Sequence, residues 1–243
     1  MSRVVSVTGF HRAGKTKVVV AIVRELTKRG YRVGTVKHIP EEDFTIDQPG
    51  KDTWLHAKAG AKVVVSLAAH EVARMEKRSA NLAEALEGLQ VMDFAVVEGF
   101  KNVRGFARVV VAQSKAEADK LIDEFTIACV GAKCASVPTF GFRETAKIVD
   151  IIEEKAYPLL PGLDCKICGY DSCDRLAAAI VSGKERWNRC QAVGRVTLTV
   201  DGKVIPLIKF PQKIFESTVK GMVASLRDAK GTEIELRVKK HAR

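Results

Sequence analysis

The chain of 243 residues has no run of about 18 apolar residues, the length that a membrane-spanning helix requires. It also lacks the apolar segment and small-residue cleavage site of a secretory signal, because MSRVVSVTGF enters a strand-like run directly. Repeats and low-complexity tracts are absent as well. We therefore expect no membrane association and a cytoplasmic chain. In that reducing setting, clustered cysteines favour metal binding over disulfides.

The chain is strongly basic, with a formal net charge of +11 at pH 7. Residues 191–243 contain 11 Lys and Arg against 5 Asp and Glu, so this tail of 53 residues carries a net +6. Such a patch suits RNA, DNA or an acidic protein. No aromatic-rich strand or nucleic-acid-reading motif accompanies it, so we interpret it as a solvated face and expect no nucleic-acid partner.

Strand-like and helix-like segments alternate over residues 1–157, which predicts a doubly wound α/β domain with a mostly parallel sheet. The predicted strands are residues 4–7, 33–36, 62–66, 94–97, 108–112 and 126–130, and the predicted helices are residues 15–29, 82–86, 116–122 and 144–155.

Pro158, Pro161 and Gly162 mark a boundary, after which residues 158–192 form a small four-cysteine module. Residues 193–243 predict a basic α+β unit of ββαβ order. It has a hairpin turn at residues 201–202, a helix at 213–227 and a last strand at 233–238.

The run GFHRAGKT fits the phosphate-binding pattern G-x-x-x-x-G-K-[ST], with a predicted strand before it and a predicted helix after it. Gly9 and Gly14 allow the tight turn that brings backbone N–H groups onto phosphate oxygens. Lys15 adds a charge at the β- and γ-phosphates, and Thr16 offers a hydroxyl to Mg²⁺. The predicted nucleotide-binding residues of this loop are Gly9, His11, Arg12, Ala13, Gly14, Lys15 and Thr16; for Arg12 a solvated side chain is the alternative.

Such a site needs an acidic group at the carboxyl end of a neighbouring strand, where ligands of open α/β sheets bind. In MDFAVVEGFK, Glu98 follows the predicted strand 94–97, whereas Asp93 precedes it. We expect Glu98 to act with Lys15 in catalysis, either holding Mg²⁺ through water or orienting an attacking water. A surface carboxylate that caps the next loop is the alternative. Because no N-K-x-D motif is present, the residues predict a weak NTPase without specifying GTP over ATP.

Together with the phosphate loop, two further motifs lie in TVKHIPEEDFTIDQPGKDTWLHAKAGA and VVEGFK. This ordered set resembles the molybdopterin-guanine dinucleotide biosynthesis protein B (MobB) family over roughly the first 155 residues. The resemblance implies a GTP-binding, dimer-forming accessory protein of molybdenum or tungsten pterin cofactor synthesis. Its partner would be a molybdopterin nucleotidyltransferase or a molybdenum or tungsten enzyme.

The resemblance adds Lys37, His38, Asp47, Lys51 and Asp52 to the expected nucleotide- or cofactor-binding residues. Read from the residues alone, His38 is equally a hydrogen-bonding residue, and the Pro-Gly turn beside Lys51 is equally a polar turn. Family members often carry further histidines after the Lys-His pair, where this chain has Ile39 and Pro40.

Four of the six cysteines lie within 26 residues with the spacing C-x2-C-x4-C-x16-C: Cys165, Cys168, Cys173 and Cys190. Four thiolates suit a [4Fe–4S] cluster or tetrahedral Zn²⁺. Only one C-x2-C pair is present, and C-x2-C-G-x3-C with Leu-Ala-x2-Ile resembles the cluster module of corrinoid iron-sulfur proteins and of the B protein of Rnf-type electron-transfer complexes. We therefore expect [4Fe–4S], with zinc as the alternative. Cys129 and Cys134 are expected to be buried or incidental thiols.

The leading hypothesis is an NTPase accessory of pterin cofactor maturation whose iron-sulfur module serves delivery to, or recognition of, a metalloenzyme. A nucleotide-gated iron-sulfur electron donor or metalloenzyme maturation factor is a second hypothesis, because both sites occur in one chain. A third is a module whose basic tail binds RNA or an acidic partner.

Overall fold

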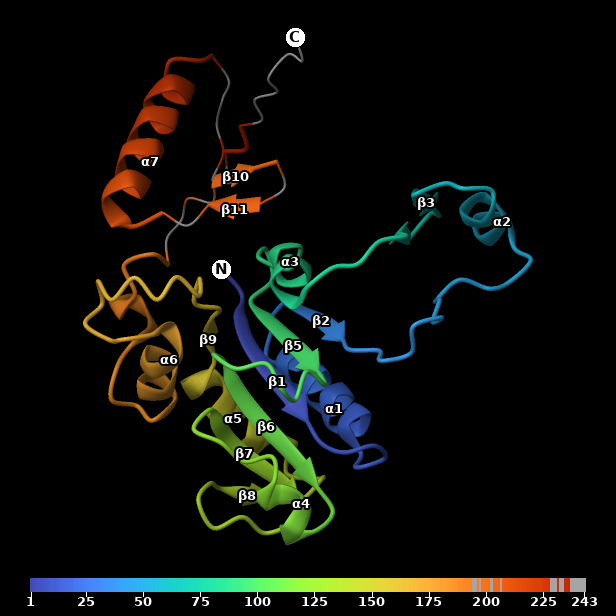
Figure 1. Cartoon of the computed structure of the whole chain (residues 1–243), viewed down its shortest axis with the longest axis vertical. Coiled ribbons are helices and arrows are strands. Elements are labelled where there is room, and N and C mark those ends of the chain that lie inside the picture. Colours follow the sequence, from blue (N-terminus) through green and yellow to red (C-terminus); the bar gives the residue numbers. More distant parts are fainter. Residues whose placement is uncertain are drawn as a thin grey trace.

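The computed structural model describes residues 1–193, 196, 198–201, 203–205, 207–227, 231 and 234–236. Its largest unit is a seven-stranded sheet in the order β2-β5-β1-β6-β7-β8 (Figure 1). All neighbours along this path are parallel, and β9 pairs antiparallel with β1. The strands are β1 (Arg3–Thr8), β2 (Val33–Lys37), β5 (Phe94–Glu98), β6 (Ala107–Ala112), β7 (Thr126–Gly131), β8 (Thr139–Phe140) and β9 (Tyr157–Pro158).

Helices cover both faces of this sheet, which confirms the predicted doubly wound fold. On one face, α1 (Lys15–Lys28) and α5 (Thr145–Lys155) pack on β1, β6 and β7 around one apolar core. On the other, α3 (Leu82–Glu87) covers β5, and α4 (Lys115–Asp119) covers β6 and β7. Strands β5 and β6 are buried along their whole length, as their continuous apolar runs require.

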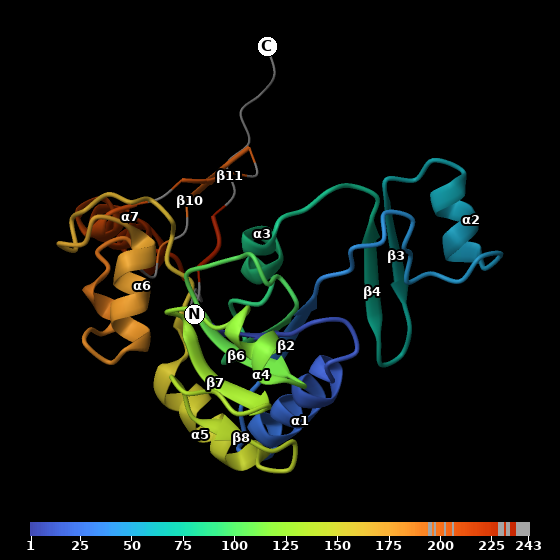
Figure 2. The same cartoon turned by 60° about the horizontal axis from the view of Figure 1, so that its bottom comes forward.

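Residues 38–81 form an arm that leaves the sheet after β2 and extends away from it (Figures 1 and 2). The arm contains α2 (Asp52–Lys58) and an antiparallel hairpin of β3 (Val63–Leu67) and β4 (Val72–Glu76). The prediction that residues 62–66 join the central sheet is therefore wrong, and β4 was not predicted. An apolar β-branched run predicts a strand, but does not specify the strand with which it pairs.

The cysteine module contains α6 (Cys173–Val181) and the short helix η1 (Trp187–Arg189). Beyond it, β10 (Leu198–Val200) and β11 (Lys203–Ile205) form a hairpin, followed by α7 (Lys209–Ala224). Helix α7 begins earlier than predicted because Pro211 fits a first helical turn, which needs no N–H donor there. Helix α4, predicted over residues 116–122, is shorter than expected.

The predicted last strand is wrong for residues 234–236, which have no regular secondary structure; its other residues, 233, 237 and 238, lie outside the described part. None of the described helices is long and apolar enough to cross a membrane.

Candidate functional site

The P-loop, residues 9–16, connects β1 to α1 with the geometry that its glycines require. A Cβ atom at Gly9 would lie 2.4 Å from the Val111 carbonyl oxygen, so no larger residue fits there. Gly14 has a left-handed φ of 95° and forms the N-cap of α1 without any side-chain cap. Gly14 therefore offers no side-chain acceptor to the first N–H groups of α1, and such uncapped groups at a helix N-terminus attract phosphate.

The lysine of this loop is held by the loop itself. Lys15 Nζ donates to the Phe10 carbonyl oxygen at 2.7 Å, which places its charge over the turn. Gln113, just beyond β6, donates to the Arg12 carbonyl oxygen at 3.1 Å and fixes the tip of the loop. The side chains of His11 and Arg12 are exposed, and Ala13 is buried.

Glu98 ends β5 next to the P-loop, at the carboxyl edge where the parallel strands finish. Its Oε1 accepts a hydrogen bond from Thr16 Oγ1 at 2.9 Å and lies 3.8 Å from Lys37 Nζ. Glu98 is buried, with 8% of its surface exposed. The Thr16 hydroxyl and the Glu98 carboxylate thus offer adjacent oxygens, the donor type that Mg²⁺ prefers.

His38 lies at the same carboxyl edge of the sheet as Glu98, whereas Asp93 does not. His38 continues from β2, donates its N–H to the Glu98 carbonyl oxygen at 2.9 Å, and packs its ring on Phe100. Asp93 lies at the opposite end of β5, where it accepts from the Arg32 N–H at 2.8 Å, so it is not part of the site.

Three predicted binding residues lie on the arm and not beside this chain's P-loop. Asp47 Oδ1 accepts from Thr53 Oγ1 at 2.9 Å and from the Gln48 N–H at 2.9 Å. Lys51 is the N-cap of α2, and Asp52 is in its first turn. Figures 1 and 2 show this segment extending away from the sheet, so any contact of these residues with the nucleotide remains a prediction.

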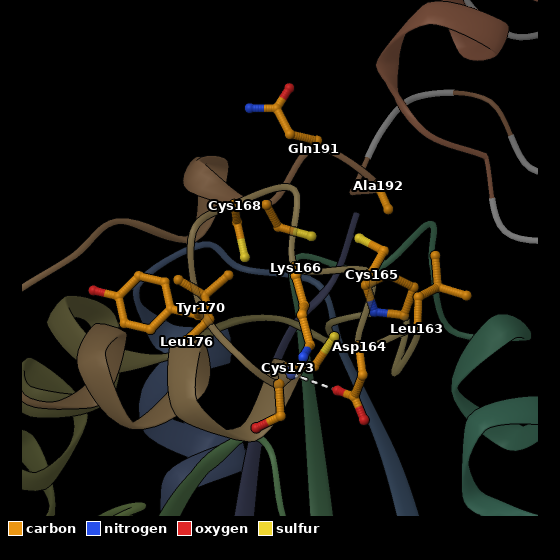
Figure 3. Close-up of a pocket in the computed structure, with 13 residues that line it drawn as sticks. Leu163, Asp164, Cys165, Lys166, Cys168, Tyr170, Cys173, Leu176, Gln191 and Ala192 are labelled. Carbon is orange, nitrogen blue, oxygen red and sulfur yellow. Dashed lines mark hydrogen bonds between the residues drawn. The ribbon is translucent and has the colours of Figure 1, made fainter.

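The four clustered cysteines line one cavity in the module after β9. Figure 3 shows the sulfur atoms of Cys165, Cys168 and Cys173 around this hollow, and Cys190 lines it as well. The turn that carries the first two thiols has left-handed φ values at Asp164, Lys166 and Gly169. In the described part of the chain, no three His, Cys, Asp or Glu side chains lie close enough together to hold a metal ion.

Two hydrogen bonds hold the backbone of the cysteine residues that line this cavity. Asp164 Oδ1 accepts from the Cys173 N–H at 2.6 Å, and Arg189 Nε donates to the Cys168 carbonyl oxygen at 3.1 Å. Burial raises the pKa of the Cys173 thiol. All four predicted ligands on this cavity are thiols, with no histidine or carboxylate among them. Thiolates are the ligands that iron-sulfur clusters and four-cysteine zinc sites use.

The P-loop and the cysteine cavity lie at opposite edges of the sheet. The P-loop contacts the carboxyl ends of β5 and β6, whereas α6 follows β9, which pairs with the first residues of β1. Strands of five or six residues are roughly 16–20 Å long, and this length separates the two edges of the sheet. The eight-residue segment 99–106 runs between these edges, because β5 ends at the carboxyl edge and parallel β6 begins at the amino edge.

Cys129 and Cys134 lie side by side, with their Sγ atoms in contact, and the expectation of a buried thiol is confirmed for Cys129. Cys129 is fully buried in β7, and Cys134 lies in the loop after it. The pair ties the carboxyl end of β7 to that loop.

A family model described as Molybdopterin guanine dinucleotide synthesis protein B, or MobB, matches residues 4–132, more than half of the chain. The chain belongs to the MobB family. A second family model, described as "Putative Fe-S cluster", matches residues 160–192, the segment that carries the four thiols. The predicted resemblance to MobB is confirmed, and the second match agrees with an iron-sulfur module.

Individual proteins with MobB names are also similar to this chain. A "Putative molybdopterin-guanine dinucleotide biosynthesis adapter protein" of Methanocaldococcus jannaschii is 29% identical over 246 residues, covering 98% of this chain and 99% of that protein. A "Probable molybdopterin-guanine dinucleotide biosynthesis adapter protein" of Bacillus subtilis is 30% identical over 122 residues, covering 49% of this chain and 69% of that protein. The crystal structure of Bacillus subtilis MobB superposes with a TM-score of 0.55 at 24% identity, over 64% of this chain and 98% of that one, which shows the MobB fold.

Sequence reasoning missed the ionic link between the MobB-like domain and the cysteine module. Arg104, in the segment 99–106, contacts Asp174 at the start of α6. These residues are 70 positions apart. No local pattern signals the pair, although Asp174 directly follows a predicted ligand.

Proposed function

We propose that this MobB family member is an accessory protein of molybdopterin guanine dinucleotide biosynthesis that binds and slowly hydrolyses GTP in the cytoplasm. The observation that carries the proposal is the 2.9 Å contact between Thr16 Oγ1 and Glu98 Oε1, which joins the P-loop to the acidic strand end. The names of the relatives support the pathway. The word adapter in those names supports a partner protein, and we propose a molybdopterin nucleotidyltransferase or a molybdenum or tungsten enzyme.

The residues of the site serve phosphate binding, metal binding and catalysis. The amides of residues 12–16 and Lys15 hold the β- and γ-phosphates. Thr16 and Glu98 would hold Mg²⁺, which when bound neutralises charge on those phosphates. Glu98, whose Oε1 lies 3.8 Å from Lys37 Nζ, orients the attacking water.

Two substitutions test this assignment. Lys15→Ala should abolish magnesium-dependent GTP binding, measured by calorimetry, because it removes the ammonium group at the phosphates. Glu98→Gln should lower hydrolysis by roughly a hundredfold with a smaller effect on affinity. Asp93→Asn, at the other end of the same strand, is the matched control and should hydrolyse GTP like the wild type. Unchanged turnover in Glu98→Gln would refute the catalytic role.

The cysteine cavity supports a [4Fe–4S] cluster held by Cys165, Cys168, Cys173 and Cys190, with Zn²⁺ as the alternative. The shared cavity and the match to an Fe-S family model support this choice. Anaerobic purification followed by iron, sulfide and zinc analysis tests it. Equal amounts of iron and sulfide with broad visible absorption support the cluster, and one zinc per chain without sulfide contradicts it.

The position of the cavity favours delivery or recognition over direct nucleotide chemistry. Because the two sites lie at opposite edges of the sheet, cluster and phosphates can face different partners. A nucleotide-gated electron donor differs in one measurement: its cluster potential would shift when GTP binds. A constant potential supports the docking role.

The arm supports a homodimer. Val63, Val65 and Leu67 lie on the outer face of β3 and are exposed, with exposed Val72 opposite Leu67 on β4. Val64 points the other way and is buried. A two-stranded hairpin is marginally stable in water, so an apolar outer face of this kind fits burial against a second copy.

A further inference from the structure

Beyond binding of the phosphates, we infer that Phe142 is the surface on which the purine base of the nucleotide stacks. The inference rests on the proposed function, because it assumes a nucleotide at the P-loop. Phe142 follows β8 and lies beside the P-loop at the carboxyl edge. A Cβ atom at Gly14 would lie 3.1 Å from its Cε1, and one at Gly131 would lie 3.5 Å from its Cε2.

The ring is held between two glycines but is not enclosed. Phe142 keeps 46% of its surface exposed. Among the described residues, no other aromatic ring stacks on it. An aromatic side chain placed beside an anion-binding turn, with much of its surface open, is suited to stacking on a base.

The order of the strands decides on which side of the P-loop the base lies. The P-loop follows β1, in the middle of the sheet. Glu98 and Lys37, which the proposed function places near the γ-phosphate, end β5 and β2 on one side. The base is at the other end of the nucleotide and therefore lies on the side of β6, β7 and β8. Phe142 follows β8 on that side.

The loop near Phe142 favours stacking on the face of the base over hydrogen bonds to the edge of the base. Residues 132–138, AKCASVP, contain no carboxylate or carboxamide that could pair with the donors of guanine. Glu144, the nearest acidic residue in sequence after the loop, already accepts from the Gly141 N–H at 2.9 Å and from Lys147 Nζ at 2.8 Å. Every base has a π face, so the stacking contact serves GTP and ATP alike.

Three ligands separate base binding from phosphate binding: GTP, ATP and inorganic tripolyphosphate, each with Mg²⁺ and the full-length protein. In calorimetry, Phe142→Ala should weaken binding of both nucleotides by about tenfold and leave tripolyphosphate unaffected. Phe142→Leu keeps an apolar side chain against the two glycines and should lose the same affinity, whereas Phe142→Tyr should retain it. Phe210→Ala, on an exposed phenylalanine of α7, is the control and should change nothing.

The outcomes distinguish this inference from the proposed function. If Phe142→Ala and Phe142→Leu bind both nucleotides like the wild type, or lose tripolyphosphate equally, the stacking role is wrong while the phosphate site stands. If the wild type binds none of the three ligands, the proposed function itself fails, and the stacking role with it.

Discussion

Arg104 and Asp174 form an ion pair, with Arg104 Nε 3.1 Å from Asp174 Oδ2, that joins the MobB-like domain to the cysteine module. Asp174 directly follows Cys173 in the first turn of α6. Arg104 also pairs with Glu124 and lies over the ring of Phe125, 5.0 Å from its centroid. The segment 99–106 begins next to Glu98, so one short stretch of chain touches both candidate sites.

Removal of this ion pair should loosen the module. Arg104→Ala and Asp174→Ala should each accelerate amide hydrogen exchange in α6 while leaving α1 unchanged. Both side chains are about half exposed, so a double-mutant cycle should give a coupling free energy of only about 0.5 kcal/mol. The Lys115 and Asp119 pair on α4 provides the control, because its loss should not affect α6. Identical exchange in all variants would mean that apolar packing alone docks the module.

A buried arginine next to this link predicts a larger effect on stability. Arg108 Nη1 lies 2.6 Å from Asp123 Oδ2, its Nη2 donates to the Val103 carbonyl oxygen, and burial lowers its pKa. Arg108→Ala removes the charged partner of the Asp123 carboxylate and should lower the free energy of unfolding by about 3 kcal/mol. Urea unfolding measures this change.

The exposed Arg74 of the arm provides the control for Arg108. It pairs with Glu76 at 2.7 Å in solvent, so Arg74→Ala should cost less than about 0.5 kcal/mol. Equal urea midpoints for the two variants would contradict the predicted role of the buried pair.

Much of the central fold and of the nucleotide site follows from local sequence. The P-loop was predictable because its chemistry requires glycines, a lysine and a hydroxyl at fixed spacing between a strand and a helix. Glu98 was predictable because a buried strand must end where the ligand binds. Strands β1, β5, β6 and β7 were predictable because burial on both faces requires continuous apolar runs, whereas β8 and β9, with two residues each, were not predicted.

What could not be predicted depends on contacts between distant residues. The residues of β3 read as a strand, but only the structure shows that they pair with β4 outside the central sheet. Arg104 and Asp174 carry no spacing signal, and Phe142 reads as an ordinary loop residue until the fold places it on Gly14 and Gly131. Cys129 and Cys134 lie in and just beyond an apolar strand, a position that predicts buried or incidental thiols but does not show that the two sulfur atoms meet.

The cysteine module offers a test with an internal control. Cys165→Ser, Cys168→Ser, Cys173→Ser and Cys190→Ser should each lower the iron and sulfide content of anaerobically purified protein, because each removes one thiolate ligand. Cys134→Ser, outside the cavity, should retain both. Iron content that is unchanged in the first four variants, or that falls in the fifth, would contradict the assigned ligands.

The arm predicts the oligomeric state. Val65→Asp places a charge on the apolar outer face of β3 and should convert a dimer into a monomer, because burial of an unpaired carboxylate against a second copy is costly. Size-exclusion chromatography with light scattering measures the mass, and circular dichroism confirms that the variant remains folded. Val20→Asp on α1 is a matched control: Val20 and Val65 are 49% and 48% exposed, but only Val65 lies on the arm. A monomeric wild type would contradict the dimer, and a dimer that survives Val65→Asp would place the interface elsewhere.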